Sequence, residues 1–387
     1  MKAYTSNNIR NIAVLGHGGK GKTTLCEAML YLAGATDRLG KVADGNTVLD
    51  FDAEEKRKKS SVSSAMAAIE WDNTKLNIID APGLFDFESG SAEAVRAAEA
   101  VLIVTSAGSG VDVGTEKAFK AAEKRGLAKF FAITKTDSDH RSFYKTFEAL
   151  KEVYGNKLCP TIIPYMEGNI TKSYVNLMTG MAYEYDENGK ATKVPMPNDP
   201  VIEEMTAAFM EAVATTDDEL MEKFFEGETF TPDEILKGLC TGIFDGSIYP
   251  VYAVAGLTCA GVDQLLYNLA WSVPGAYGYA GETAKNEAGE DVVLPCDING
   301  PLAAICFKTV ADPFVGKMSF FKVVSGKLSA DTQAYNVRTG ETEKMGKIVT
   351  VKGGKQEDAK EIIAGSERDL KISLIAEGLR AFILSEK

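Results

Sequence analysis

The sequence GHGGKGKT, from Gly16 to Thr23, limits the fold more than any other stretch of the chain. It follows the short apolar run Ile12–Leu15 and precedes a helical pattern over Thr23–Leu32. This is the strand–loop–helix setting that the motif G-x-x-x-x-G-K-[ST] requires. Glycines permit positive φ angles and close backbone approach, so successive N–H groups can line an anion site at a helix N-terminus. A glycine-rich turn without a ligand is the alternative, but the complete setting favours a phosphate-binding loop.

Two side chains of this loop are predicted to act on a nucleotide. Lys22 is expected to reach the β- and γ-phosphates, and the Thr23 hydroxyl is expected to ligate Mg²⁺. The imidazole of His17 is expected to pack or to form a hydrogen bond rather than act as a base, because the loop binds through its backbone. Lys22 is also assigned to catalysis. The residues predicted to contact the nucleotide here are Gly16, His17, Gly18, Gly19, Lys20, Gly21, Lys22, Thr23 and Thr24.

A second motif, DAPG, directly follows the apolar run Leu76–Ile79. Its carboxylate, Asp80, is predicted to hold Mg²⁺ through water, and Gly83 is predicted to free its N–H to meet a γ-phosphate. An isolated D-x-x-G is weak evidence. Its position after a strand, and downstream of a phosphate-binding loop, makes the prediction stronger.

A third motif, TKTD from Thr134 to Asp137, follows the strand-like run Phe130–Ile133. The Asp137 carboxylate can accept two hydrogen bonds from the N1 and N2 groups of guanine, whereas adenine lacks the exocyclic 2-amino group. Lys135 would lie along the base. The usual first residue of this motif is Asn, and Thr134 replaces it. A surface turn would be the preferred interpretation of TKTD alone, but the series of three motifs predicts GTP rather than ATP.

Composition sets the broad class of protein. A chain of 387 residues predicts two or three domains, and 45% apolar residues are ample for buried cores. The formal net charge of −13 argues against a mainly phosphate-binding surface, so we expect no sequence-specific nucleic-acid binding. The six cysteines form no C-x-x-C pair, and the sequence contains neither a signal peptide nor an apolar run long enough to span a bilayer. We expect a cytoplasmic, monomeric protein without membrane contact.

Short apolar runs alternate with helical patterns in the first 275 residues, which predicts an α/β P-loop domain with a mostly parallel sheet and helices on both faces. An inserted helical or mixed subdomain is predicted at about 155–248, a linker at 276–295, and an all-β Greek-key barrel at 296–387. The predicted strands are Ile12–Leu15, Leu76–Ile79, Val101–Thr105, Phe130–Ile133 and Val251–Val254. The predicted helices are Thr23–Leu32, Ala92–Ala98, Thr115–Arg125, Phe143–Tyr154 and Val262–Ala270.

With these motifs in place, the chain resembles elongation factor G and its elongation-factor-G-like paralogues, which are translational GTPases. GNTVLDFDAEEKRKKSSVSSA resembles the first switch region, and the resemblance places Ser61 where the family has a threonine that ligates Mg²⁺. ELMEKFFEGETFTPDEILKGL resembles the inserted helical subdomain, and FKTVADPFVGKMSFFKVVSGKL resembles the start of the second, β-barrel domain. PVYAVAGLTCAGVDQLL resembles the last guanine-binding loop, which adds Ala255, Gly256 and Leu257 to the predicted site.

The sequence departs from the family pattern at three places. Leu84 stands where the family has its catalytic histidine, Gly19 stands where full factors have an aspartate, and Lys58–Val62 reads KKSSV instead of R-G-I-T-I. Full-length factors also continue into three further domains, so we expect this chain to be either a fragment of a longer protein, which we favour, or a naturally short relative. An apolar side chain cannot orient water. Loss of a side chain that does so lowers the rate of hydrolysis by a factor of roughly 10²–10⁴.

The resemblance therefore implies binding of GTP or GDP with Mg²⁺ held by Thr23, Ser61 and Asp80, and it implies slow or partner-dependent hydrolysis. One hypothesis is a GTPase that acts with the ribosome. The second is a GTP-dependent binding switch with little turnover, which Leu84 favours. A third is a ribosomal protection protein of the tetracycline-resistance type. The simplest alternative for Leu84 is that it packs against Phe85 or Phe87.

Overall fold

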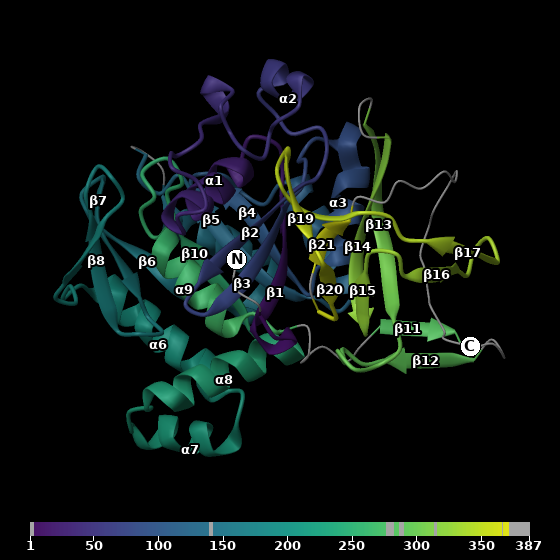
Figure 1. Ribbon diagram of the computed structural model, residues 1–387. Helices are drawn as coiled ribbons and strands as arrows, with labels where there is room; N and C mark the ends of the chain where they lie inside the picture. The colour runs from purple at the N-terminus through teal and green to yellow at the C-terminus, as the bar shows by residue number, and fades with distance from the viewer. Residues whose placement is uncertain are drawn as a thin grey trace.

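The computed structural model describes residues 4–138, 142–275, 282–285, 290–312, 316–365 and 367–370. A ten-stranded sheet with its helices makes up the first part of the chain, and antiparallel strands of the second part lie beside it (Figure 1). Among the helices in the described ranges, none is long and apolar enough to cross a bilayer.

The strands of the large sheet are β1 (Ile9–Leu15), β2 (Ala65–Trp71), β3 (Thr74–Asp80), β4 (Ala100–Ser106), β5 (Ala128–Thr134), β6 (Leu158–Glu167), β7 (Ile170–Asn176), β8 (Met181–Tyr185), β9 (Ala191–Val194) and β10 (Tyr249–Ala253). The α-helices are α1 (Lys22–Leu32), α2 (Ala53–Lys58), α3 (Glu88–Ala97), α4 (Val113–Lys124), α5 (Phe143–Tyr154), α6 (Pro200–Ala214), α7 (Asp218–Glu226), α8 (Pro232–Asp245) and α9 (Val262–Ser272). Short 3₁₀ helices are η1 (Ser6–Asn8), η2 (Val42–Asp44), η3 (Phe85–Phe87) and η4 (Gly155–Lys157).

The order of the sheet is β2-β3-β1-β4-β5-β10-β6-β7-β8-β9. The pairs from β3 through β1, β4, β5 and β10 to β6 are parallel, whereas β2 and β7–β9 run antiparallel to their neighbours. Every residue of β3, β4, β5 and β10 is buried, as expected of strands covered on both faces. This confirms the predicted mostly parallel α/β sheet.

Helices cover the sheet on both faces. The α1 and α9 helices pack on each other and on β2 and β3, while α3 and α4 pack on each other and on β1 and β4. The apolar core therefore lies in two layers, one on each side of the sheet. Since the carboxyl ends of the parallel strands meet at one edge, the loops that follow β1, β3, β5 and β10 converge there.

The predicted insertion at about 155–248 is more closely joined to the sheet than its sequence indicates. The β6 strand pairs in parallel with β10, and β7, β8 and β9 extend the sheet as an antiparallel edge. The acidic run 201–226, inside the predicted helical or mixed subdomain, lies in two helices, α6 and α7, separated by a turn. The segment is therefore an extension of the main sheet followed by a helical unit.

The second part of the chain is a small antiparallel β domain, as predicted. Its strands are β11 (Glu282–Lys285), β12 (Asp291–Leu294), β13 (Ala303–Asp312), β14 (Gly316–Ser325), β15 (Lys327–Ser329), β16 (Gln333–Asn336), β17 (Glu341–Lys344), β18 (Ile348–Lys352), β19 (Lys355–Ala359), β20 (Glu361–Ile363) and β21 (Glu367–Leu370). The β11 and β12 strands pair as a hairpin inside the predicted linker. Residues 371–387 of the predicted domain lie outside the described residues.

Two hydrogen bonds join the beginning of the chain to the end of this β domain. Ser6 Oγ donates to the carbonyl of Ala364 at 2.7 Å. Asn11 Nδ2, on β1, donates to the carbonyl of Gly365 at 3.3 Å. Both polar side chains are buried, so a partner is required, and residues more than 350 positions away supply it.

Candidate nucleotide site

The predicted phosphate loop joins β1 to α1, and its glycines occupy positions that other residues could not fill. Gly16 has φ of +141°, and a Cβ placed on it would lie 2.2 Å from the carbonyl oxygen of Val104 on β4. Gly21, the N-cap of α1, has φ of +88°. The loop therefore has a backbone conformation that favours glycine and leads directly into the N-terminus of α1, the setting in which proteins bind anions.

Lys22 lies at the centre of this loop with its side chain buried. Its Nζ donates hydrogen bonds to the carbonyls of Gly16 and His17, each at 3.0 Å. A Cβ placed on Gly83 would lie 2.2 Å from the same Nζ, so the DAPG loop meets the phosphate loop at this ammonium. Burial lowers the pKa of Lys22, while nearby carboxylates, led by Asp80, oppose that effect.

A cavity of about 220 Å³ opens between these loops. Its walls come from the phosphate loop, from the segment before β2 and from the loop after β5. The residues that line it are Gly18, Gly19, Gly21, Lys22, Thr23, Thr24, Val42, Asp50, Lys59, Ser60, Ser61, Gly83 and Lys135.

A cluster of hydroxyl and carboxylate groups lies at one end of the cavity. Thr23 Oγ1 donates to Asp80 Oδ2 at 2.6 Å and lies 3.1 Å from Ser61 Oγ. Ser61 Oγ in turn donates to Asp50 Oδ1 at 2.7 Å. The structure thus brings together the three predicted metal ligands and adds Asp50, which the sequence did not single out. The sequence offers one signal for Asp50: it is an acidic residue in the segment GNTVLDFDAEEKRKKSSVSSA, which resembles the first switch region.

The carboxylates of this cluster fit a divalent cation. Burial, with a smaller contribution from Asp50, raises the pKa of Asp80 to about 7 against the hydrogen bond from Thr23. Within the described part of the chain, Asp80 Oδ1 and Asp50 Oδ2 are buried and accept no hydrogen bond. Hydroxyl and carboxylate oxygens are the ligands that Mg²⁺ prefers. A cation bound beside these groups would favour the ionised form of the Asp80 carboxyl.

The predicted base-recognition residues lie at the end of β5 and in the loop that follows it. Thr134 Oγ1 donates to the carbonyl of Lys20 at 2.6 Å, and Lys135 Nζ donates to the carbonyl of Gly19 at 2.8 Å. Asp137 Oδ2 accepts a hydrogen bond from Thr258 Oγ1 at 3.0 Å. The loop after β5 is therefore tied to the phosphate loop and to the loop after β10.

The loop after β10 holds the last three predicted residues. Ala255 N–H donates to the carbonyl of Ala260 at 2.9 Å, which closes the loop. A Cβ placed on Gly256 would lie 3.2 Å from Thr24, and Leu257 is exposed. Thr258 is the residue of this loop that the sequence missed, because its importance depends on the contact with Asp137 from another loop.

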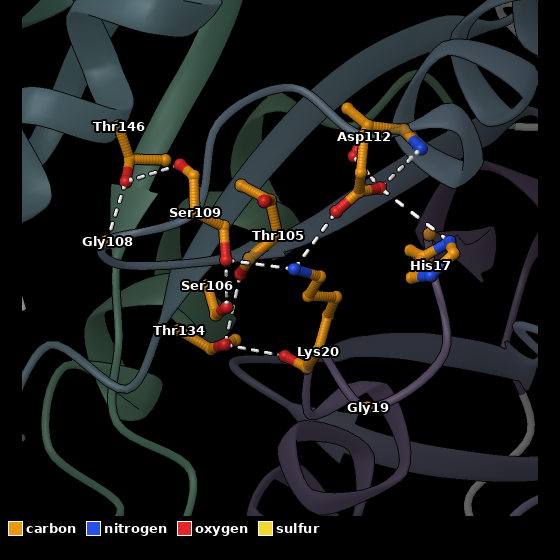
Figure 2. Close-up of polar contacts among 12 residues, drawn as sticks. His17, Gly19, Lys20, Thr105, Ser106, Gly108, Ser109, Asp112, Thr134 and Thr146 are labelled. Carbon is orange, nitrogen blue, oxygen red and sulfur yellow. Dashed lines mark hydrogen bonds and ion pairs between the residues drawn. The ribbon is translucent and has the colours of Figure 1, made fainter.

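A second set of polar contacts joins the phosphate loop to the segment between β4 and α4 (Figure 2). Lys20 Nζ forms an ion pair with Asp112 at 3.0 Å and donates to Ser109 Oγ at 2.8 Å. Burial alone would raise the pKa of Asp112, but hydrogen bonds led by the one from Lys20 lower it. His17 Nδ1 lies 4.0 Å from Asp112, and its ring contacts Phe85 edge-on with centroids 5.6 Å apart. The sequence did not predict Asp112 as part of the site.

Leu84 follows Gly83 at the start of η3 and is 41% exposed. A Cβ placed on Gly18 would lie 2.9 Å from Leu84 Cδ2, so the leucine side chain abuts the phosphate loop. Leu84 and Phe85 also line a mainly apolar cavity of about 140 Å³ between α3 and α4. Leu84 therefore places an apolar side chain directly against Gly18 of the phosphate loop.

The sheet topology and the loops that meet at this cavity define a P-loop nucleotide-binding protein. Residues 7–274 match the family "Elongation factor Tu GTP binding domain", and residues 301–367 match "Elongation factor G domain 2". The "Elongation factor G-like protein" of Mycobacterium tuberculosis (strain CDC 1551 / Oshkosh) is 32% identical over 331 residues, which cover 84% of this chain and 46% of the relative.

A crystal structure from Thermus thermophilus superposes with a TM-score of 0.84 and 30% sequence identity, covering 98% of this chain and 55% of that chain. The chain belongs to the elongation factor G-like family of translational GTPases. It spans about half the length of the relatives that it matches.

Proposed function

We propose that this protein binds guanine nucleotide with Mg²⁺ and acts on the ribosome as a GTPase or GTP-dependent switch whose own hydrolysis is slow. The observation that carries the proposal is that Thr23, Ser61 and Asp80 lie together at the phosphate loop while the apolar Leu84 lies beside the same loop. Binding and hydrolysis are thereby separated, because the first needs Lys22 and the oxygen cluster, and the second also needs a group that positions water.

Mg²⁺ would be held by Thr23, Ser61 and Asp80, with Asp50 supporting Ser61 through its hydrogen bond. When bound, the ion neutralises phosphate charge. Lys22 would exchange its carbonyl partners for phosphate oxygens, since an ammonium gains more from an anion than from neutral acceptors. These groups position the nucleotide and stabilise charge without any side chain that transfers a proton.

On the base side, Asp137 would accept from guanine N1 and N2, and Thr258 would orient the carboxylate for that role. Thr134 supports the phosphate loop through Lys20 instead of touching the base.

Single-turnover hydrolysis of GTP by the chain, measured with and without ribosomes, tests the proposal. We expect nucleotide binding together with slow turnover in isolation. A titration with GTP, GDP and ATP belongs to the same experiment, and equal affinity for ATP would refute the assignment of the base site. Rapid turnover without any partner would refute the role given to Leu84.

Leu84 favours a second candidate, a switch that binds GTP and GDP without useful hydrolysis. Its output would be a domain rearrangement between the two nucleotide states. Ribosome-stimulated turnover at the rate of a histidine-containing factor would exclude this candidate.

A further inference from the structure

We propose that Lys308 of the β domain is a positioning residue for the triphosphate form of the nucleotide, acting through the segment that carries Ser61. The proposal rests on the proposed function, because it assumes that Ser61 contributes to a metal site. Lys308 lies on β13, far along the chain from the phosphate loop, yet its side chain reaches the end of the segment before β2.

The Lys308 ammonium is buried among acceptors from this segment. It donates to Ser63 Oγ at 2.6 Å, to Ser64 Oγ at 3.0 Å, and to the carbonyl oxygen of Ser64. Its side chain is only 6% exposed, and the ammonium also lies 5.6 Å from the centre of the Phe320 ring. A buried cation with several acceptors fixes its partners strongly, since separating them would leave a desolvated charge.

The same lysine reaches α3, the helix that follows the DAPG loop. Glu93 Oε2 lies 3.9 Å from Lys308 Nζ and accepts a hydrogen bond from Ser64 Oγ at 2.7 Å. Lys308 therefore contacts both elements that follow the predicted nucleotide contacts: the segment after Ser61 and the helix after Gly83. A movement of either element would have to change the contacts of this ammonium.

A second contact from the β domain holds the other end of the Ser61 segment. The turn between β18 and β19 lies against it, and a Cβ placed on Gly353 would lie 1.9 Å from the carbonyl oxygen of Val48. Gly353 N–H also donates to the carbonyl of Met66 at 2.9 Å. Asp50 and Ser61 lie in the sequence between these two points of contact with the β domain. The β domain therefore restrains the segment that holds both side chains.

Another buried lysine of the β domain offers a matched comparison. Lys322, on β14, forms an ion pair with Glu99 beyond the end of α3 and lies 4.0 Å from Glu282. Glu282 also pairs with Arg96 at 3.0 Å. This second cluster joins the two parts of the chain through Glu99 and Glu282, which both lie outside the segment that carries Ser61.

The experiment compares the affinities of the whole chain for GDP and for a non-hydrolysable GTP analogue, both fluorescently labelled, in the presence of Mg²⁺. Lys308→Met keeps the aliphatic stem and removes the donors. We expect the affinity for the GTP analogue to fall roughly tenfold, with GDP affinity changed less than twofold, because several hydrogen bonds to a charged group are lost in the state that uses Ser61. Lys308→Arg keeps the charge, and we expect its ratio of GTP-analogue affinity to GDP affinity to lie between those of the wild type and Lys308→Met.

Ser63→Ala provides a milder variant in case Lys308→Met folds poorly. It removes a single acceptor of the lysine, and we expect a shift of the same sign by a few-fold. Lys322→Met is the matched control, and it should lower the melting temperature while leaving the ratio of the two affinities unchanged.

An unchanged ratio in both Lys308→Met and Ser63→Ala, in a wild-type background that binds both nucleotides, would overturn this inference alone. An equal change in Lys322→Met would also overturn it, because the effect would then belong to domain docking in general. A wild-type chain that binds neither guanine nucleotide would overturn the proposed function and this inference with it.

Discussion

Thr23, in the first turn of α1, and Asp80, the last residue of β3, are joined by a 2.6 Å hydrogen bond in which the hydroxyl donates to the carboxylate. The hydrogen bond favours the ionised carboxylate, but it does not compensate for burial, and the pKa of Asp80 is raised to about 7. Asp50 raises this pKa further and Lys22 lowers it. Without a cation, the site therefore holds a carboxyl group that keeps its proton up to neutral pH.

The first prediction concerns the pH dependence of stability in EDTA without nucleotide. The folded state keeps the Asp80 proton up to about pH 7, whereas the unfolded chain releases it near its ordinary value of 3.8. The free energy of unfolding should therefore fall as pH rises between these two values. Asp80→Asn should flatten this decline and stabilise the metal-free protein at pH 8. Urea unfolding at pH 5, 6, 7 and 8 measures both effects, and identical slopes for the two proteins would contradict the prediction.

The second prediction is that Leu84→His increases hydrolysis of bound GTP in the presence of ribosomes by about 10²-fold. The imidazole would start from a position that already abuts Gly18, next to the cavity. Single-turnover rates with ribosomes measure the gain. Leu84→Ala is the control, since it removes the same apolar contact and supplies no polar group. An equal gain in the alanine variant would show that steric hindrance, and not a missing polar group, limits turnover.

The third prediction concerns the base. Asp137→Asn replaces one carboxylate acceptor by an amide donor, so two hydrogen bonds to guanine are disturbed, and GTP affinity should fall about 10²-fold or more. The amide can donate to the 2-oxo group of xanthine, so xanthosine triphosphate should then bind better than GTP. Competition titrations measure this exchange of preference. Thr258→Ala should weaken GTP only a few-fold, because it removes the support of the carboxylate and keeps the carboxylate itself.

The fourth prediction concerns the ion pair between Lys20 of the phosphate loop and Asp112. Asp112→Asn keeps an oxygen that can accept from Thr115 at the start of α4, but it removes the charge opposite Lys20. We expect a loss of about 1 kcal/mol in the free energy of unfolding at pH 7. Because the pKa of Asp112 is lowered in the folded protein, the wild-type advantage should shrink as pH falls below 4. Chemical unfolding at pH 7 and pH 3 tests this, and a constant difference would contradict it.

The architecture of the first domain was predictable because its parallel strands are buried on both faces and read as short apolar runs. The strands β6 to β9 were not, and β6 shows why: it contains Pro160 and Pro164, which argue against a strand that pairs on both sides. The strand accommodates them with shifts in register near Val251 and near Tyr165. Long-range pairing thus overrides a local signal that favours loop structure.

The candidate site divides in the same way. Residues that are assigned from the spacing of a motif, such as Lys22 and Asp80, are recognisable within a few neighbouring positions. Asp112 and Thr258 are not, because each matters through a partner on another loop. Asp50 is not either, because its partner Ser61 lies 11 positions further along the same segment. Their assignment required the folded chain.

The hydrogen bonds from Ser6 to Ala364 and from Asn11 to Gly365 have a consequence for the order in which the chain completes its folding during synthesis. During synthesis, the first strand leaves the ribosome long before its partners in the β domain are translated. Until then, water must accept the hydrogen bonds that Ser6 Oγ and Asn11 Nδ2 later donate to the β domain, although Asn77 of the first domain can already donate to Asn11 Oδ1. The first domain can therefore form its sheet early, but it reaches its final packing only when the end of the β domain arrives to close over its first strand.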